Sequence, residues 1–186
     1  MVPMLVSCGA AGVALMGCRN LSTNQTGGGE LKPLARKVDL ERFMGSWYVI
    51  AHIPIFLEKD AYNAVETYQL ADDGSIPTTF TFNQGGFDGP LKTMHPTGTI
   101  YNKETNAEWR MKFIWPLKAA YLITYLSDDY QTTIIGVPDR KYAWIMARTK
   151  TIPAARYAGM LKELKQQGYD LAKLRKVPQG KGTSAE

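Results

Sequence analysis

The sequence predicts an all-β fold, an eight-stranded antiparallel up-and-down barrel with one C-terminal α-helix packed on its outside. Three observations support this prediction. Aromatic residues make up 11% of the 186 residues, and aromatic side chains suit pleated, half-buried strands. From Val38 onward, short aromatic and β-branched runs alternate evenly with turn residues. One run alternates strictly between apolar and charged positions. Eight such strands close into a barrel with room for one small ligand.

The first seventeen residues have the character of a secretory signal. Residues 3–17 are uncharged and small to apolar, and this stretch is too short to span a bilayer. It ends in Leu15-Met16-Gly17-Cys18, which is similar to the box at which bacterial lipoproteins are cleaved and lipidated. We therefore expect a lipoprotein signal peptide over 1–17 and a membrane anchor on Cys18. An ordinary secretory signal with an incidental cysteine is the alternative, because no Lys or Arg precedes the apolar stretch.

A polar segment separates this signal from the barrel. Residues 18–37 have no apolar period, so we expect a flexible tether. The barrel domain is expected over 38–178, followed by a disordered tail over 179–186. Both cysteines precede the barrel, which is therefore expected to hold neither a disulfide nor a thiolate metal site.

The strands are expected where apolar runs lie between turn residues such as Asp73-Gly74. His95-Pro96 predicts a bend within the fourth run, because proline cannot donate to a strand ladder. The charged Glu58-Lys59-Asp60 is expected in the long first loop, at the open end of the barrel. The expected strands span residues 45–54, 62–71, 76–83, 91–101, 107–115, 119–127, 130–136 and 141–149.

Alternation within the runs predicts which side chains face the interior. In the fifth run, Trp109 and Met111 share one face, while Arg110 and Lys112 share the other. Glu66 is expected at the rim or outside, since an unpaired buried carboxylate is costly. Plain core packing explains the apolar faces as well as a ligand cavity does. The ligand-binding lining is expected to comprise Trp109, Met111, Phe113, Tyr121, Ile123, Tyr125 and Tyr68.

The last expected strand needs a cover, because residues 142–147 are apolar on both faces. A helix after Pro153 is expected to supply it, since proline favours the first turn of a helix. Gly168 is placed to end this helix in a left-handed conformation. The covering face is expected to comprise Tyr157, Met160, Leu161 and Leu164, which recur at helical spacing.

The order of these elements and three short motifs resemble the lipocalin family, over about residues 38–178. Gly45-Ser46-Trp47 is similar to the Gly-x-Trp that begins the family's first strand. Ser127-Asp128-Asp129-Tyr130 is similar to its second motif, with Asp in place of the usual Thr, and Arg148 matches the third. The stretch 136–145 is similar to bacterial outer-membrane lipocalins, of which apolipoprotein D is a more distant relation.

The resemblance implies roles and ligands. Gly45, Trp47 and Arg148 are expected to close one end of the barrel, with the Arg148 guanidinium over the Trp47 ring. The implied ligands are fatty acids or lysophospholipids, carried in the bacterial cell envelope for membrane maintenance or storage. Arg19, directly after the lipidated cysteine, implies the outer membrane, with the protein facing the periplasm.

The sequence carries no signal for catalysis, a cofactor, a metal or nucleic acid. His52 and His95 are the only histidines and lack metal-ligand spacing. No nucleophile elbow, phosphate loop or dinucleotide fingerprint is present. The net charge of +5 is too dispersed for a nucleic-acid strip. A lipocalin-fold enzyme acting on a bound lipid and a non-binding envelope scaffold remain as alternatives, and the residues neither predict nor exclude a homodimer.

Overall fold

The computed structural model describes residues 29–114 and 117–180, without the side chains of 113–118. Within these residues, the strands are β1 Gly45–Ile53, β2 Ala61–Tyr68, β3 Ser75–Gln84, β4 Leu91–Met94, β5 Thr97–Ile100, β6 Glu108–Ile114, β7 Leu117–Leu126, β8 Thr132–Gly136, β9 Ala143–Ala147 and β10 Arg175–Lys176. The helices are α1 Leu40–Phe43, the 3-10 helix η1 Phe56–Glu58, α2 Ala154–Gln166 and the 3-10 helix η2 Leu171–Lys173. No helix of this part of the chain is long and apolar enough to cross a bilayer.

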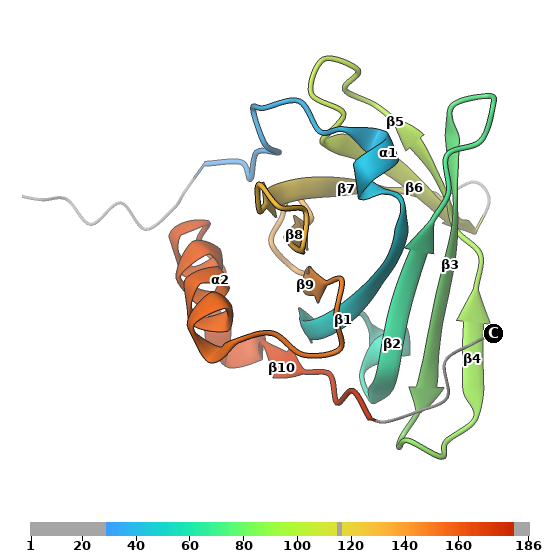
Figure 1. Cartoon of the computed structure of the whole chain (residues 1–186), viewed down its shortest axis with the longest axis vertical. Helices are drawn as coiled ribbons and strands as arrows, with labels where there is room; N and C mark the ends of the chain where they lie inside the picture. The colour runs from blue at the N-terminus through green and yellow to red at the C-terminus, as the bar shows by residue number, and fades with distance from the viewer. Residues whose placement is uncertain (1–28, 115–116, 181–186) are drawn as a thin grey trace, which may run out of the picture.

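The strands form one antiparallel sheet that follows chain order and closes where β9 pairs with β1 (Figure 1). The predicted bend at His95-Pro96 is confirmed, because it divides the fourth strand into β4 and β5, which both pair with β3. The carbonyl of Pro96 still accepts a hydrogen bond from the N–H of Thr78 at 2.9 Å. With β4 and β5 counted as one strand, the predicted eight-stranded barrel is confirmed.

Two apolar clusters lie on opposite sides of the barrel wall. The inner cluster lies on the inside of the barrel wall, whereas the outer cluster lies between the wall and α2, the helix that packs outside the barrel in Figure 1. Met160 and Leu164 of α2 are fully buried in the outer cluster. In β9, Ile145 belongs to the outer cluster and Met146 to the inner one. The helix is therefore the predicted cover of a strand that is apolar on both faces, and Gly168 follows it with a φ of +86°.

The segment before the barrel is more ordered than predicted. Leu31 is buried in the outer cluster, and the N–H of Leu34 donates to the carbonyl of Ile123 at 2.9 Å. The Arg36 guanidinium donates to the carbonyl of Leu126 at 2.6 Å. The prediction of a flexible tether is therefore wrong for residues 31–37, because buried leucine and backbone pairing hold them to the barrel. The earlier part of the expected tether, with Cys18 and the signal peptide, lies outside the described residues.

The C-terminal segment, residues 175–180, completes the wall between β1 and β2. These two strands stop pairing after Tyr48 and Val65, and β10 then pairs with the rest of β1. At the point of divergence, the Gln179 side-chain nitrogen donates to the carbonyls of Val49 at 2.8 Å and Ala64 at 3.1 Å. The prediction of a disordered tail from residue 179 is therefore wrong at its first two positions, because side-chain and backbone hydrogen bonds hold them.

Candidate ligand-binding site

The antiparallel order of the strands gathers the loops at two ends. The loops after β2, β5 and β7 lie with α1 at one end, called here the sealed end (Figure 1). The loops after β1, β3, β6 and β8 lie at the other, called here the open end. A ligand that entered the barrel from the open end would therefore meet the inner cluster before it met α1.

Arg148 and Trp47 close the sealed end, as predicted. The guanidinium carbon of Arg148 lies 3.8 Å from the centre of the Trp47 ring. Its nitrogens donate to the carbonyls of Ser46 at 2.9 Å and Phe43 at 2.9 Å. The Trp47 indole N–H donates to the Phe43 carbonyl at 2.8 Å. Gly45 begins the strand with a φ of +89°, a conformation that suits glycine.

The second motif meets the first at the same end. The N–H of Asp39 donates to the Tyr130 hydroxyl at 3.0 Å, and the Arg42 guanidinium carbon lies 3.9 Å from the Tyr130 ring centre. The backbone N–H of Arg148 donates to the carbonyl of Gln131 at 3.0 Å. All three motifs therefore hold α1 against the barrel, which is a structural role.

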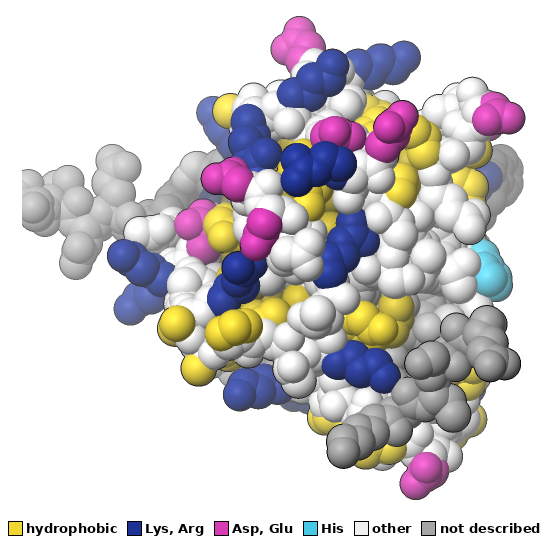
Figure 2. Space-filling model, in the orientation of Figure 1, with side chains coloured by type: hydrophobic (Ala, Val, Ile, Leu, Met, Phe, Trp, Pro, Cys, Tyr) yellow, Lys and Arg dark blue, Asp and Glu magenta, His cyan; other side chains and the backbone are white. Residues whose placement is uncertain are grey.

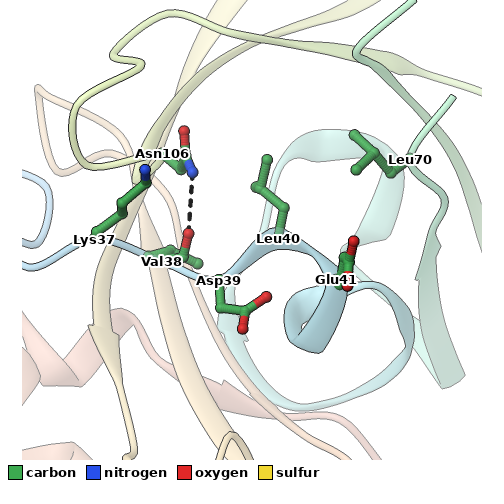
Figure 3. A pocket seen from close by; sticks show the side chains of 7 residues that line it. All are labelled: Lys37, Val38, Asp39, Leu40, Glu41, Leu70 and Asn106. Atoms are coloured by element: carbon green, nitrogen blue, oxygen red, sulfur yellow. Dashed lines mark hydrogen bonds between the residues drawn. The ribbon is translucent and has the colours of Figure 1, made fainter. Parts of the chain in front are cut away.

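A surface pocket of about 500 Å³ lies outside the sealed end, around α1 (Figure 3). Its walls carry charges of both signs, and the Asn106 amide already donates to the carbonyl of Val38 at 3.1 Å. No set of polar groups converges on one point, so this pocket lacks the features of a ligand site. It is lined by Lys37, Val38, Asp39, Leu40, Glu41, Leu70 and Asn106.

The inner wall holds most of the predicted lining residues. Trp109, Met111 and Ile123 are fully buried in the inner cluster, so in this structure they pack as core. Tyr68 and Tyr121 lie in the same cluster, and Tyr121 stacks on Trp109 with ring centres 5.3 Å apart. The side chain of Phe113 lies outside the described residues.

Tyr125 does not face the interior, and its prediction as a lining residue is wrong. The pairing of β7 with β8 shifts between Ile123 and Tyr125, where Ile123 pairs with Ile135 and Tyr125 with Ile134. Such a β-bulge inserts one residue into the alternation, so the side chains beyond it change face. Tyr125 therefore packs in the outer cluster, and its neighbour Leu126 in the inner one.

Glu66 lies inside the barrel, where we expected a rim or outer position. Its cross-strand partners Trp47 and Phe80 both belong to the inner cluster, and directly paired residues share a face. The Tyr68 hydroxyl donates to Glu66 Oε2 at 2.5 Å and offsets part of the cost of burial. Burial nevertheless raises the pKa of Glu66 to about 7.

The two inner tyrosines extend this contact into a chain. The hydroxyl groups of Tyr68 and Tyr121 are hydrogen-bonded to each other. Burial raises the pKa of both phenols well above the ordinary value, so both stay protonated at physiological pH. A carboxylate and two phenols therefore form one polar cluster on the inner wall.

A second polar cluster comes from the first long loop. Glu58 Oε2 accepts a hydrogen bond from the Trp144 indole N–H at 2.9 Å and lies 3.3 Å from His52 Nδ1. Both Glu58 and His52 are buried. Sequence reasoning treated Glu58 as a charged loop residue and missed this cluster. The available signal was Trp144, whose indole N–H needs a partner once the strand is buried.

The open end exposes apolar side chains beside basic ones. Phe56 is 89% exposed and Leu57 is 56% exposed. An adjacent groove of about 380 Å³ is lined in part by Phe56, Lys59, Lys173 and Arg175. On the face that Figure 2 shows, Lys and Arg side chains are otherwise scattered among acidic ones. In the described ranges, no three His, Cys, Asp or Glu side chains gather as metal ligands would.

Residues 38–179 match the family model of a lipocalin-like domain. Temperature-induced lipocalin-1 of Arabidopsis thaliana is 32% identical over 158 residues, covering 78% of this chain and 82% of that protein. Outer membrane lipoprotein Blc of Escherichia coli strain K12 is 29% identical over 137 residues, covering 73% of this chain and 76% of that protein. Among solved structures, insecticyanin from the tobacco hornworm Manduca sexta aligns with a TM-score of 0.64 at 21% identity, covering 81% of this chain and 85% of that one.

Proposed function

The chain belongs to the lipocalin family, and from that premise we propose that its barrel binds and carries a fatty acid or a lysophospholipid in the bacterial cell envelope, for membrane maintenance or storage. The observation that carries the proposal is the inner cluster, an apolar wall inside a closed barrel whose sealed end is held by the motifs described above. An acyl chain that enters from the open end would exchange water for this wall.

The physics of such binding is burial of apolar surface. Each buried CH₂ group contributes about 0.8 kcal/mol, so a long acyl chain reaches micromolar affinity or better after the cost of association. We propose that Tyr68, Trp109, Met111, Tyr121 and Ile123 make this contact, with Phe113. Binding rather than catalysis is proposed, because the polar groups described inside the barrel are hydrogen-bonded mainly to one another.

The experiment is a titration of the purified protein with a fluorescent fatty acid, followed by competition with a lysophospholipid. Saturable fluorescence enhancement, reversed by the competitor, is the expected result. Lys112→Ala, on the exposed outer face of β6, serves as the matched control and should leave the curve unchanged. Absence of saturable binding would defeat the proposal and favour an envelope scaffold with a filled barrel.

We also propose that Cys18 is lipidated and that the anchor places the barrel on the outer membrane, facing the periplasm. The similarity to an outer membrane lipoprotein and the Leu15-Met16-Gly17-Cys18 box support this location. Mass spectrometry of the mature amino terminus tests it, with Cys18→Ser as the variant that should appear in the soluble fraction. An unmodified Cys18 at the mature terminus would eliminate the anchor.

A further inference from the structure

The number of protons in the cluster of Glu66, Tyr68 and Tyr121 decides which hydrogen bonds it can make with a ligand. A phenol has one proton to donate, and the proton of Tyr68 goes to Glu66 Oε2. The contact between the two hydroxyl groups must then be donated by Tyr121. Both phenol protons are therefore committed within the cluster. With Glu66 ionised, the cluster has no proton left to offer an incoming group, so it accepts hydrogen bonds and donates none.

One oxygen of this cluster, Glu66 Oε1, accepts no hydrogen bond from any described residue, and it is not one of the fully buried unpaired atoms. Glu66 as a whole is only partly buried, although it faces inward between Trp47 and Phe80. Oε1 is therefore an acceptor on the inner wall that no described residue uses.

The surroundings of Glu66 are poor in positive charge. The titratable groups on its side are Tyr68 on β2, Tyr121 on β7 and Glu58 on η1, and the charge of Glu58 further raises the pKa of Glu66. His52 of β1 lies against Glu58. Arg148 lies beyond Trp47 and donates to three backbone carbonyls. No Lys or Arg is buried in the described part of the chain. A ligand carboxylate would thus meet two carboxyl groups without a free cation.

We infer that Glu66, Tyr68 and Tyr121 form a subsite for the polar end of a ligand that donates hydrogen bonds, namely a protonated amine or a hydroxyl group. This inference rests on the proposed function, because it assumes that an apolar chain occupies the barrel. It narrows that function, because of the two proposed ligands it favours the lysophospholipid, whose glycerol carries a free hydroxyl group, over a fatty acid whose carboxylate would face an ionised Glu66. Donor-headed ligands pair with Oε1, and carboxylate-headed ligands are repelled while Glu66 is ionised.

The test compares three probes of one chain length, dodecylamine, dodecanol and dodecanoate, titrated calorimetrically into the full chain at about pH 8.5, where Glu66 is ionised. The amine and the alcohol should each bind at least about tenfold more tightly than dodecanoate. Glu66→Gln should reduce this preference to about threefold or less, because the amide carries no charge. Glu108→Gln, on the same barrel but paired with Arg110 away from the interior, should leave the preference unchanged.

A second measurement needs only the unaltered protein. Its affinity for dodecanoate should fall as the pH rises through about 7, whereas its affinity for dodecanol should stay level. Equal binding of all three probes at high pH, or a preference that Glu66→Gln does not change, would overturn the subsite while leaving the proposed function standing. If none of the three probes binds, the subsite and the proposed function are both overturned.

Discussion

Arg148 shows how much of the fold can depend on one side chain. Its guanidinium joins the end of β9 to the start of β1 through the Trp47 ring and the carbonyls of Ser46, Arg42 and Phe43. These contacts connect residues that are more than a hundred positions apart in the chain. A sequence motif predicted the pair, but only the structure shows that the carbonyls of α1 complete it.

Replacing Arg148 with Ala is expected to lower the free energy of unfolding by about 2–4 kcal/mol, because hydrogen bonds to a charged group and a cation–π contact are lost together. Chemical denaturation measures this loss. Arg110→Ala is the matched control, since Arg110 also stacks on an aromatic ring, Tyr101, at 3.7 Å but pairs with Glu108 on the outer face. Arg110→Ala should lower the free energy of unfolding by about 1 kcal/mol or less. Equal losses for the two variants would contradict the sealing role.

Glu66 is expected to make stability depend on pH. Burial raises its pKa from 4.5 to about 7, so between these values the folded protein holds a proton that the unfolded chain has released. Glu66 therefore disfavours folding as the pH rises through this window, by at most about 3 kcal/mol above pH 7. Glu66→Gln should be relatively more stable above pH 7 than below pH 4.5, as measured by urea denaturation across the range. Parallel profiles for the two proteins would contradict the assignment.

Two predictions about single residues, Tyr125 and Glu66, were wrong. Alternation placed Tyr125 beside Ile123, and a bulge of one residue reversed it, because nothing in the local composition marks where a ladder shifts. The cost of burying a carboxylate placed Glu66 outside, and the phenol of Tyr68 offset that cost. Both errors concern partners on neighbouring strands, which a pattern along one strand does not contain.

Among the elements, α2 depends on two apolar side chains. Met160 and Leu164 are fully buried, while the rest of the helix is half-buried or exposed. Its apolar spacing was visible in the sequence, as were its beginning after Pro153 and its end before Gly168. The ordered segment at 31–37 was not visible, because its leucines are too few to produce a period and bind only once the outer cluster exists.

Leu164→Ala is expected to destabilise the protein by about 2–5 kcal/mol, since it opens a cavity between the helix and the barrel wall. The control is Lys162→Ala, an exposed position on the same helix, for which a change within about 0.5 kcal/mol is expected. Thermal unfolding of both variants provides the comparison. A small effect of Leu164→Ala would mean that the helix is not required as a cover.

For the whole molecule, the sequence predicted a closed barrel of eight strands, and the structure agrees. The turn residues and the bend at His95-Pro96 were sufficient for that topology. The seam between β1 and β2 was not predictable. The C-terminal segment fills the gap that opens where β1 and β2 stop pairing, after Tyr48 and Val65. This gap exists only in the closed barrel, so no single stretch of sequence predicts it.

Gln179→Ala should loosen this seam. The side chain ties Val49 of β1 to Ala64 of β2, so its loss should speed amide hydrogen exchange at Asn63 and Val177 and lower the free energy of unfolding by about 1–2 kcal/mol. Gln166→Ala, exposed at the end of α2, is the control for side-chain truncation. Exchange rates at the seam that match those of the control would show that Gln179 does not hold it.

The same seam sets an order of events during synthesis. Each strand from β2 to β8 finds both its neighbours nearby in the chain, whereas β1 must wait for β9 on one edge and for the C-terminal segment on part of the other. Contacts between distant residues form slowly, because a long loop has to close first. A nascent chain therefore carries β1 with an open edge until residue 180 has been made, and an open strand edge is prone to pair with other chains. β1 is therefore the last strand to gain all its partners, although it is the first to be synthesised. A chaperone would be of most use if it bound the open edge of β1.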